Sequence, residues 1–269
     1  MHRRSSPFLV LGLIAVAASC SNLTASGGTG TPIAIVLMNA RTKGAGYTTY
    51  PRVNFYAVGS ATFSFSTVNS DTCVVGPYDS TATGATTATQ IGGGAFVLAS
   101  VSGLTDSLYK AATGDRTYHL NSLVGMPFNP GDSVTFSIAG DAAGFPPLQI
   151  IAPTAEPFTI VRPTIPPVGN PMVVQWTPAI DNNAAMYVSL LYNSPAGTGA
   201  GLNTQIFCDF HDSGQGTVQS NLLTALASSS VLFVVHAQRV RTSLQITQTG
   251  VTGYINTIST FEVPTPVSP

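Results

Sequence analysis

Short runs of alternating apolar and polar residues dominate the chain after residue 32. In residues 62–68, Phe63 and Phe65 would lie on one face of an extended strand, with Ser64 and Ser66 on the other. Gly, Pro, Asn and Asp separate these runs, and period-two runs bounded by turn residues are typical of β-strands. The pattern therefore predicts an all-β protein with strands at residues 33–39, 52–58, 62–68, 72–75, 95–101, 117–120, 133–138, 148–151, 158–161, 172–176, 185–192, 204–210, 231–239, 243–247 and 253–263.

The arrangement of these runs predicts two tandem β-sandwich domains. Six prolines fall between residues 153 and 171, where they would interrupt strand pairing and stiffen a connection. We expect an N-terminal sandwich over residues 33–152, a proline-rich linker with an edge strand over residues 153–171, and a second sandwich over residues 157–264. A helical pattern is confined to one short turn at residues 221–227, with Ser220 as its N-cap.

Two segments of the second domain resemble known modules. The sequence from Met172 to Pro178, MVVQWTP, resembles the second strand of fibronectin type III domains, in which a core tryptophan precedes a proline-containing turn. Residues 206–218 resemble a strand and Asp/Gly turn of Ig-like modules in bacterial lipoproteins. The resemblance implies an Ig-like or fibronectin type III-like sandwich with Trp176 in its core. It implies a fold and no activity.

The first twenty residues have the pattern of an export signal. A basic start is followed by an apolar run at residues 8–18, which is too short to span a bilayer and suits a signal peptide. The closing tetrapeptide, Ala-Ala-Ser-Cys20, resembles the lipobox of bacterial lipoproteins. The resemblance implies a signal peptide at residues 1–19, lipidation of Cys20, a flexible tether at residues 20–32 and an outer-membrane location facing periplasm or cell exterior. The alternative is an ordinary secretory peptide in which Cys20 is incidental.

Charge excludes one class of partner. Only 8% of the residues are charged, against the usual quarter. Loss of Arg3 and Arg4 with the signal peptide leaves eight basic and eleven acidic residues, a net charge of about −3. We therefore expect no nucleic-acid partner, because such binding requires a basic surface.

The cysteines leave two interpretations open. If Cys20 carries lipid, Cys73 and Cys208 remain in an oxidising compartment, where a disulfide would join the two halves of the protein. Alternatively, both are buried free thiols that pack as small apolar side chains. Alternation places Cys208 on the core face of its strand together with Ile206 and Phe210.

Catalytic and metal-binding patterns are missing from the sequence. No G-x-S-x-G elbow occurs, and the turn at residues 129–132 accounts for the Asp132-Ser133 pair. Asp209, His211 and Asp212 form one group of candidate metal ligands. The competing interpretation is that Phe210 points inward, its neighbours face solvent and Asp212 begins a hairpin turn. We expect no cofactor, no metal site and no enzyme activity.

Four tyrosines of the first domain, Tyr47, Tyr50, Tyr56 and Tyr78, are candidates for an aromatic ligand platform. The sequence as a whole favours a lipid-anchored envelope protein with a structural, adhesive or binding role. Its partners would be the membrane, through the lipid, and an envelope protein or glycan. The alternative is an envelope hydrolase or carbohydrate-binding protein whose site is assembled by the fold.

Overall fold

The structure is a computed structural model, and it describes residues 32–43, 46–57, 71–78, 89–110, 116–142, 144–161, 163–180, 184–194, 202–227, 233–246 and 254–265. Within these ranges the one helix is the four-residue α2 (Thr224–Ala227), inside the predicted helical turn. The chain is therefore all-β, as the alternating pattern predicts. The predicted strand at residues 62–68, and Cys20 with the signal peptide, lie outside the described residues.

The strands are β1 (Pro32–Lys43), β2 (Gly46–Ala57), β3 (Thr72–Pro77), β4 (Thr89–Gln90), β5 (Phe96–Val101), β6 (Leu104–Lys110), β7 (Tyr118–Leu120), β8 (Met126–Phe128), β9 (Ser133–Ile138), β10 (Leu148–Pro153), β11 (Ile160–Val161), β12 (Met172–Trp176), β13 (Ala184–Tyr192), β14 (Thr204–His211), β15 (Gln215–Val218), β16 (Phe233–Ile246) and β17 (Tyr254–Thr265). Strand β16 covers two predicted strands, and β4, β6, β8 and β15 were not predicted.

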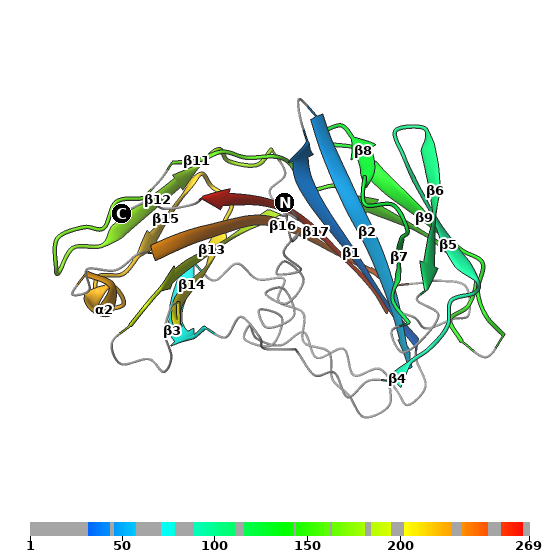
Figure 1. The fold of residues 1–269 in the computed structure, drawn as a ribbon, viewed down its shortest axis with the longest axis horizontal. Coiled ribbons are helices and arrows are strands. Elements are labelled where there is room, and N and C mark those ends of the chain that lie inside the picture. The colour runs from blue at the N-terminus through cyan, green and yellow to red at the C-terminus, as the bar shows by residue number, and fades with distance from the viewer. Residues whose placement is uncertain are drawn as a thin grey trace, which may run out of the picture.

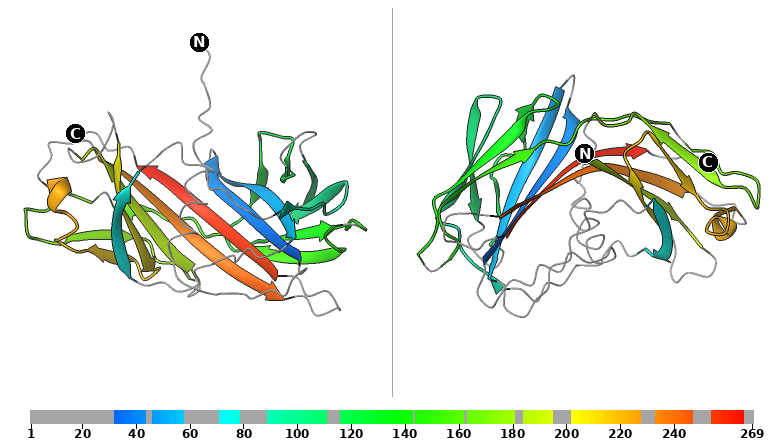
Figure 2. Two further views of the ribbon diagram at one scale, coloured as in Figure 1. Left: turned by 90° about the horizontal axis from the view of Figure 1, so that it is seen from below. Right: turned by 180° about the vertical axis from the view of Figure 1, so that it is seen from behind.

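One long sheet runs through the whole molecule (Figure 1). Its strand order is β10-β9-β5-β6-β7-β2-β1-β17-β16-β13-β14-β3, with β4 and β8 paired to β2. A second sheet contains β11, β12 and β15. Seen from below, β16 and β17 (orange and red) lie beside β1 and β2 (blue), as Figure 2 shows on the left.

The first seven strands of this order, β10 to β1, form a nearly closed, barrel-like antiparallel sheet. Aromatic side chains fill its interior: the ring of Phe55 lies 5.4 Å from that of Tyr118 and 4.7 Å from that of Phe145. Gly93 admits Phe55, because a Cβ atom at Gly93 would lie 2.3 Å from its ring. The Tyr118 hydroxyl accepts a hydrogen bond from the Gly93 amide at 2.9 Å, which satisfies the polar end of a fully buried ring.

The other half of the long sheet packs against the three-stranded sheet. Side chains at alternate positions of β13, including Met186, Val188 and Leu190, are fully buried and belong to the same core as Val174 and Trp176 of β12. This arrangement buries both inner faces, which is why the sequence of β12 alternates so regularly between buried and exposed residues.

Strands of the two predicted domains pair with one another within the long sheet. Strand β1, from the start of the first domain, pairs in parallel with β17 at the end of the second. Strand β3 of the first domain pairs with β14 of the second. The boundary at residues 153–171 stays a prediction, but strands that precede it in the sequence pair directly with strands that follow it.

Candidate binding surface

The outer face of the barrel-like sheet is set by strand alternation. On β5, Val97, Ala99 and Val101 are buried, so the residues between them point outward. Strand pairing extends this assignment across neighbouring strands, because directly opposed residues share a face. The outer face so defined comprises Phe96, Leu98, Ser100, Thr105, Ser107, Tyr109, Thr117, His119, Tyr50, Arg52, Asn54, Ile35, Leu37, Asn39 and Arg41.

A row of side chains crosses this face from β5 to β1. The pairs Phe96–Tyr109, Tyr109–His119, His119–Arg52 and Arg52–Leu37 are each directly opposed on adjacent strands. The rings of Phe96 and Tyr109 are 6.4 Å apart and exposed at 39% and 43%. At about 4.8 Å between strands, the row spans about 19 Å. It therefore presents two aromatic rings and two nitrogen-bearing side chains on a rigid base.

A second group of side chains borders the row near the N-terminal end of β2. The Arg41 guanidinium lies 5.6 Å from the centre of the Tyr50 ring, a cation–π contact. The Tyr50 hydroxyl donates to the Leu123 and Val124 carbonyl oxygens at 3.5 and 3.4 Å. Gly125, with φ of +73°, lets the ring approach, because a Cβ there would lie 2.9 Å from it. Tyr50 is thus fixed in place and Arg41 is held over it.

Polar side chains border the row on its other side. Asn54 Oδ1 accepts a hydrogen bond from Thr117 Oγ1 at 2.6 Å and from Gln90 Nε2 at 3.4 Å. Arg116 donates to the Gln90 carbonyl oxygen at 3.0 Å through one guanidinium nitrogen. These groups add donors and acceptors close to the aromatic rings.

Two of the residues of the outer face named above, Arg41 and Arg52, are basic, and none is acidic. On the next strand, Glu262 follows Phe261, the β17 partner of Ala40, so an acidic residue stands beside Arg41 in the register. The acidic residue of β6, Asp106, lies on the opposite side of the strand alternation from Tyr109. The ion pairs His211–Asp71 and Arg239–Asp212 lie in the other half of the molecule. A ligand on this face would thus meet Arg52, whose opposed residues His119 and Leu37 are not acidic.

The three candidate metal ligands, Asp209, His211 and Asp212, lie in three different environments. Asp209 is 2% exposed, so the interpretation that it faces solvent is wrong; both faces of β14 are covered at this point. His211 is on the surface, where its Nδ1 lies 2.7 Å from Asp71 Oδ2 and its amide donates to Asp71 Oδ1 at 2.8 Å. Asp212 is buried against Arg239. In the described part of the chain no three His, Cys, Asp or Glu side chains are placed to hold a metal ion.

Asp212 belongs to a buried cluster around Trp176. The indole Nε1 donates to Asp212 Oδ1 at 2.7 Å, and the ring stacks on Phe210 at 5.8 Å. Arg239, 1% exposed, donates to both Asp212 oxygens, to the Pro157 carbonyl oxygen at 2.9 Å and to the Thr177 carbonyl oxygen. Trp176 is 5% exposed, in agreement with its predicted core position. The Asp212 segment is not a hairpin turn, because it connects β14 to β15 in the other sheet.

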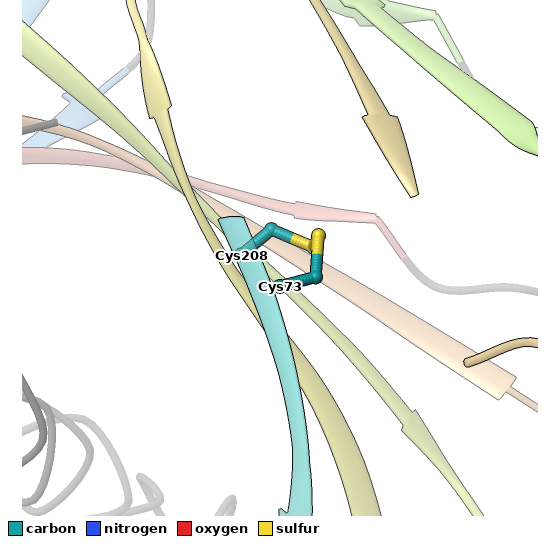
Figure 3. The surroundings of a disulfide bond; sticks show 2 residues. All are labelled: Cys73 and Cys208. Carbon is teal, nitrogen blue, oxygen red and sulfur yellow. A yellow bond between two sulfur atoms is a disulfide. The ribbon is translucent and has the colours of Figure 1, made fainter. Parts of the chain in front are cut away.

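Cys73 and Cys208 form a disulfide in which the two sulfur atoms are 2.05 Å apart (Figure 3). They are directly opposed on β3 and β14. Cys208 is fully buried beside Ile206 and Phe210, so its face was predicted correctly. Of the two interpretations that the sequence left open, the structure therefore has the disulfide and not two free thiols.

The remaining candidates for chemistry have structural contacts. Asp132 accepts hydrogen bonds from the Ser102 hydroxyl and from the Asn129 amide, and these bonds, the first more than the second, lower the pKa of its carboxyl group. His119 Nδ1 donates to the Leu120 carbonyl oxygen at 3.0 Å. Burial lowers the pKa of His236. Ser133 opens β9 next to the Asp132 turn.

The candidate tyrosines are only partly brought together. Tyr50 lies on the outer face, whereas Tyr56 is buried and Tyr47 packs on Phe128 at 5.9 Å. Tyr47 and Tyr50 belong to β2, although both precede the predicted strand at residues 52–58. Sequence reasoning missed Arg52 and Tyr109. The outward alternation Tyr50-Arg52-Asn54 was a local indication for Arg52, whereas Tyr109 lies on β6, which was not predicted. Tyr78 lies just after β3, remote from this face in the strand order.

Comparison of the sequence with models of known protein families gave no match, and none was found among curated proteins. No helix in the described ranges is long and apolar enough to cross a membrane.

Proposed function

We propose that this chain is an exported, lipid-anchored protein of the bacterial cell envelope that binds a glycan on its outer face and catalyses no reaction. The observation that carries the proposal is the row Phe96–Tyr109–His119–Arg52. Exposed aromatic rings beside amide, hydroxyl and guanidinium groups match the apolar faces and hydroxyl groups of sugars. Because these residues stand on paired strands, little ordering would accompany binding.

The proposed anchor has its support in the sequence around Cys20 and in the position of β1. Strand β1 begins at Pro32, where the predicted tether ends. The pairing of Pro32 with Ala57 lies at one end of the β1–β2 ladder, and that of Lys43 with Gly46 lies at the other, about 36 Å away. Tyr50 and Arg41 are near the second end, so the outer face would extend away from an anchor on Cys20.

We also propose that the C-terminal half is an Ig-like sandwich modified by strand exchange, the second of two tandem sandwich domains. Supporting this, Trp176 on β12 packs against Phe210 of β14, across the space between the two sheets. The half departs from a free-standing module because β3 is added at one edge and β1 adjoins β17 at the other.

Two measurements test this function. The full-length chain and its Cys20→Ser variant are expressed in a Gram-negative host, and the intact mass of the membrane fraction is measured. We expect cleavage before Cys20 plus acyl chains for the wild type only. An unlipidated wild-type mass would refute the anchor.

Binding is measured with the mature protein in detergent micelles on immobilised neutral and acidic polysaccharides. Tyr109→Ala is compared with Leu104→Ala, which removes an apolar side chain that is 50% exposed on the other side of the same strand. We expect Tyr109→Ala to weaken glycan binding about tenfold, which corresponds to about 1.4 kcal/mol, and Leu104→Ala to leave it unchanged. Absence of binding to every polysaccharide would refute the proposed function.

A further inference from the structure

The charge on the outer face narrows the class of ligand. Arg52 lies on β2, the fourth of the five strands that the row crosses, with His119 opposed on one side and Leu37 on the other. Its side chain is half-buried, and none of the described outer-face residues around it is acidic. A partly desolvated guanidinium favours an anionic partner, and its planar fork matches the two oxygens of a carboxylate or phosphate group.

Arg41, on the neighbouring strand, does not add a second such group. It lies over the Tyr50 ring, and Glu262 of β17 stands beside it in the register. A linear polymer with acidic groups and exposed sugar faces would therefore contact Arg52 and, along the row, the rings of Tyr109 and Phe96 as it crosses the strands.

From this geometry we infer that the ligand of the outer face is an acidic polysaccharide, recognised by Arg52 through its anionic groups and by Phe96 and Tyr109 through its sugar rings. This inference rests on the proposed function, since it names the ligand of the same face. Charge complementarity at Arg52 supports it, whereas the protein as a whole has a net charge of −1. Recognition of an anionic ligand would therefore depend on this local arginine and not on the charge of the whole protein.

The test compares one polymer in two charge states. Binding of the mature protein to polygalacturonate is measured beside binding to the same polymer with its carboxylates methyl-esterified. We expect at least tenfold tighter binding to the acidic form, and Arg52→Gln should remove most of that difference, since a charge-assisted hydrogen bond contributes about 1.5–3 kcal/mol. A phosphorylated mannan, measured in parallel, distinguishes phosphate from carboxylate as the preferred group.

Lys110→Gln is the matched control. It removes one positive charge from β6 at the residue next to Tyr109. Lys110 is opposed to Tyr118, so it lies on the opposite face of the sheet from Tyr109. We expect it to change binding less than twofold, and both variants should keep the wild-type unfolding midpoint.

Equal binding to the acidic and esterified polymers would overturn the inference and leave the proposed glycan function standing. Equal effects of Arg52→Gln and Lys110→Gln would also overturn it, because the attraction would then be a property of overall charge. Tighter binding to anionic phospholipid vesicles than to any polysaccharide would refute both proposals.

Discussion

The disulfide between Cys73 and Cys208 joins two strands that are 135 residues apart in the sequence, so its removal tests how strongly it holds the two halves of the chain together. In the chain-entropy model, a cross-link that closes a loop of this length lowers the entropy of the unfolded chain by an amount equivalent to about 5 kcal/mol at 25 °C. Cys73→Ala combined with Cys208→Ala removes this contribution.

The local contacts of β3 do not replace the cross-link. Val74 and Val75 are 53% and 47% exposed, so they contribute little buried apolar area. Other contacts of β3 include the backbone pairing to β14, the contact of Asp71 with His211, the hydrogen bond from Gln205 Nε2 to the Pro77 carbonyl oxygen at 3.4 Å and the one from the Tyr78 amide to Asn203 at 2.8 Å. We therefore expect β3 to separate from β14 more easily than any part of the barrel-like core opens.

Urea unfolding gives the magnitude. The oxidised wild type, the reduced wild type and the double variant are compared at one pH. Because the reduced protein keeps both sulfur atoms, its difference from the oxidised protein reports the cross-link alone. We expect 3–5 kcal/mol, with faster amide hydrogen exchange in β3 after reduction. A difference below about 1 kcal/mol, or unchanged exchange in β3, would refute the entropy argument.

Three further predictions concern the described side chains. Asp212→Ala should lower the free energy of unfolding by about 3–5 kcal/mol, because it leaves the charge of Arg239 buried and uncompensated; urea unfolding measures this, and a loss below 1 kcal/mol would contradict it. Trp176→Ala should cost a similar 3–5 kcal/mol, and the wild-type indole should fluoresce at the short wavelengths of a buried ring; an emission typical of exposed indole would exclude the core position. Asp132→Asn should lower stability near neutral pH, because Ser102 lowers the pKa of the folded carboxyl group below its ordinary 3.8, and a group with a lowered folded pKa stabilises above its unfolded pKa. The difference between wild type and Asp132→Asn should therefore shrink as pH falls below about 4 and through the lowered pKa, and a difference that is constant from pH 7 to pH 2 would contradict this reasoning.

The binding variants and the stability variants separate two kinds of result. Arg52→Gln and Tyr109→Ala change outward side chains with few packing contacts, so we expect them to alter affinity and leave unfolding unchanged. Asp212→Ala and Trp176→Ala change buried side chains in the other half of the molecule, so they should lower stability first. Loss of glycan binding in a fully folded Trp176→Ala protein would place the binding site elsewhere.

Alternation along the chain was sufficient to determine the fold class and most strand positions. The strand at residues 172–176 was predicted with its observed bounds and with Trp176 inward, because a strand buried on one face must alternate in composition. Strand β6 was missed because Thr105, Asp106 and Ser107 interrupt the apolar pattern at a place where the strand is largely exposed. Strand β16 was divided in two at polar residues 241–242.

Tertiary structure alone decided which strands are neighbours. Alternation fixes the face on which a side chain lies, but it does not fix its partner, since pairing between distant strands depends on burial of the assembled sheets. The pairing of β1 with β17, the opposition of Cys73 to Cys208 and the placing of Arg52 beside His119 all join distant segments. The sequence therefore could not predict that these side chains form one surface, although the outward direction of each one follows from local alternation.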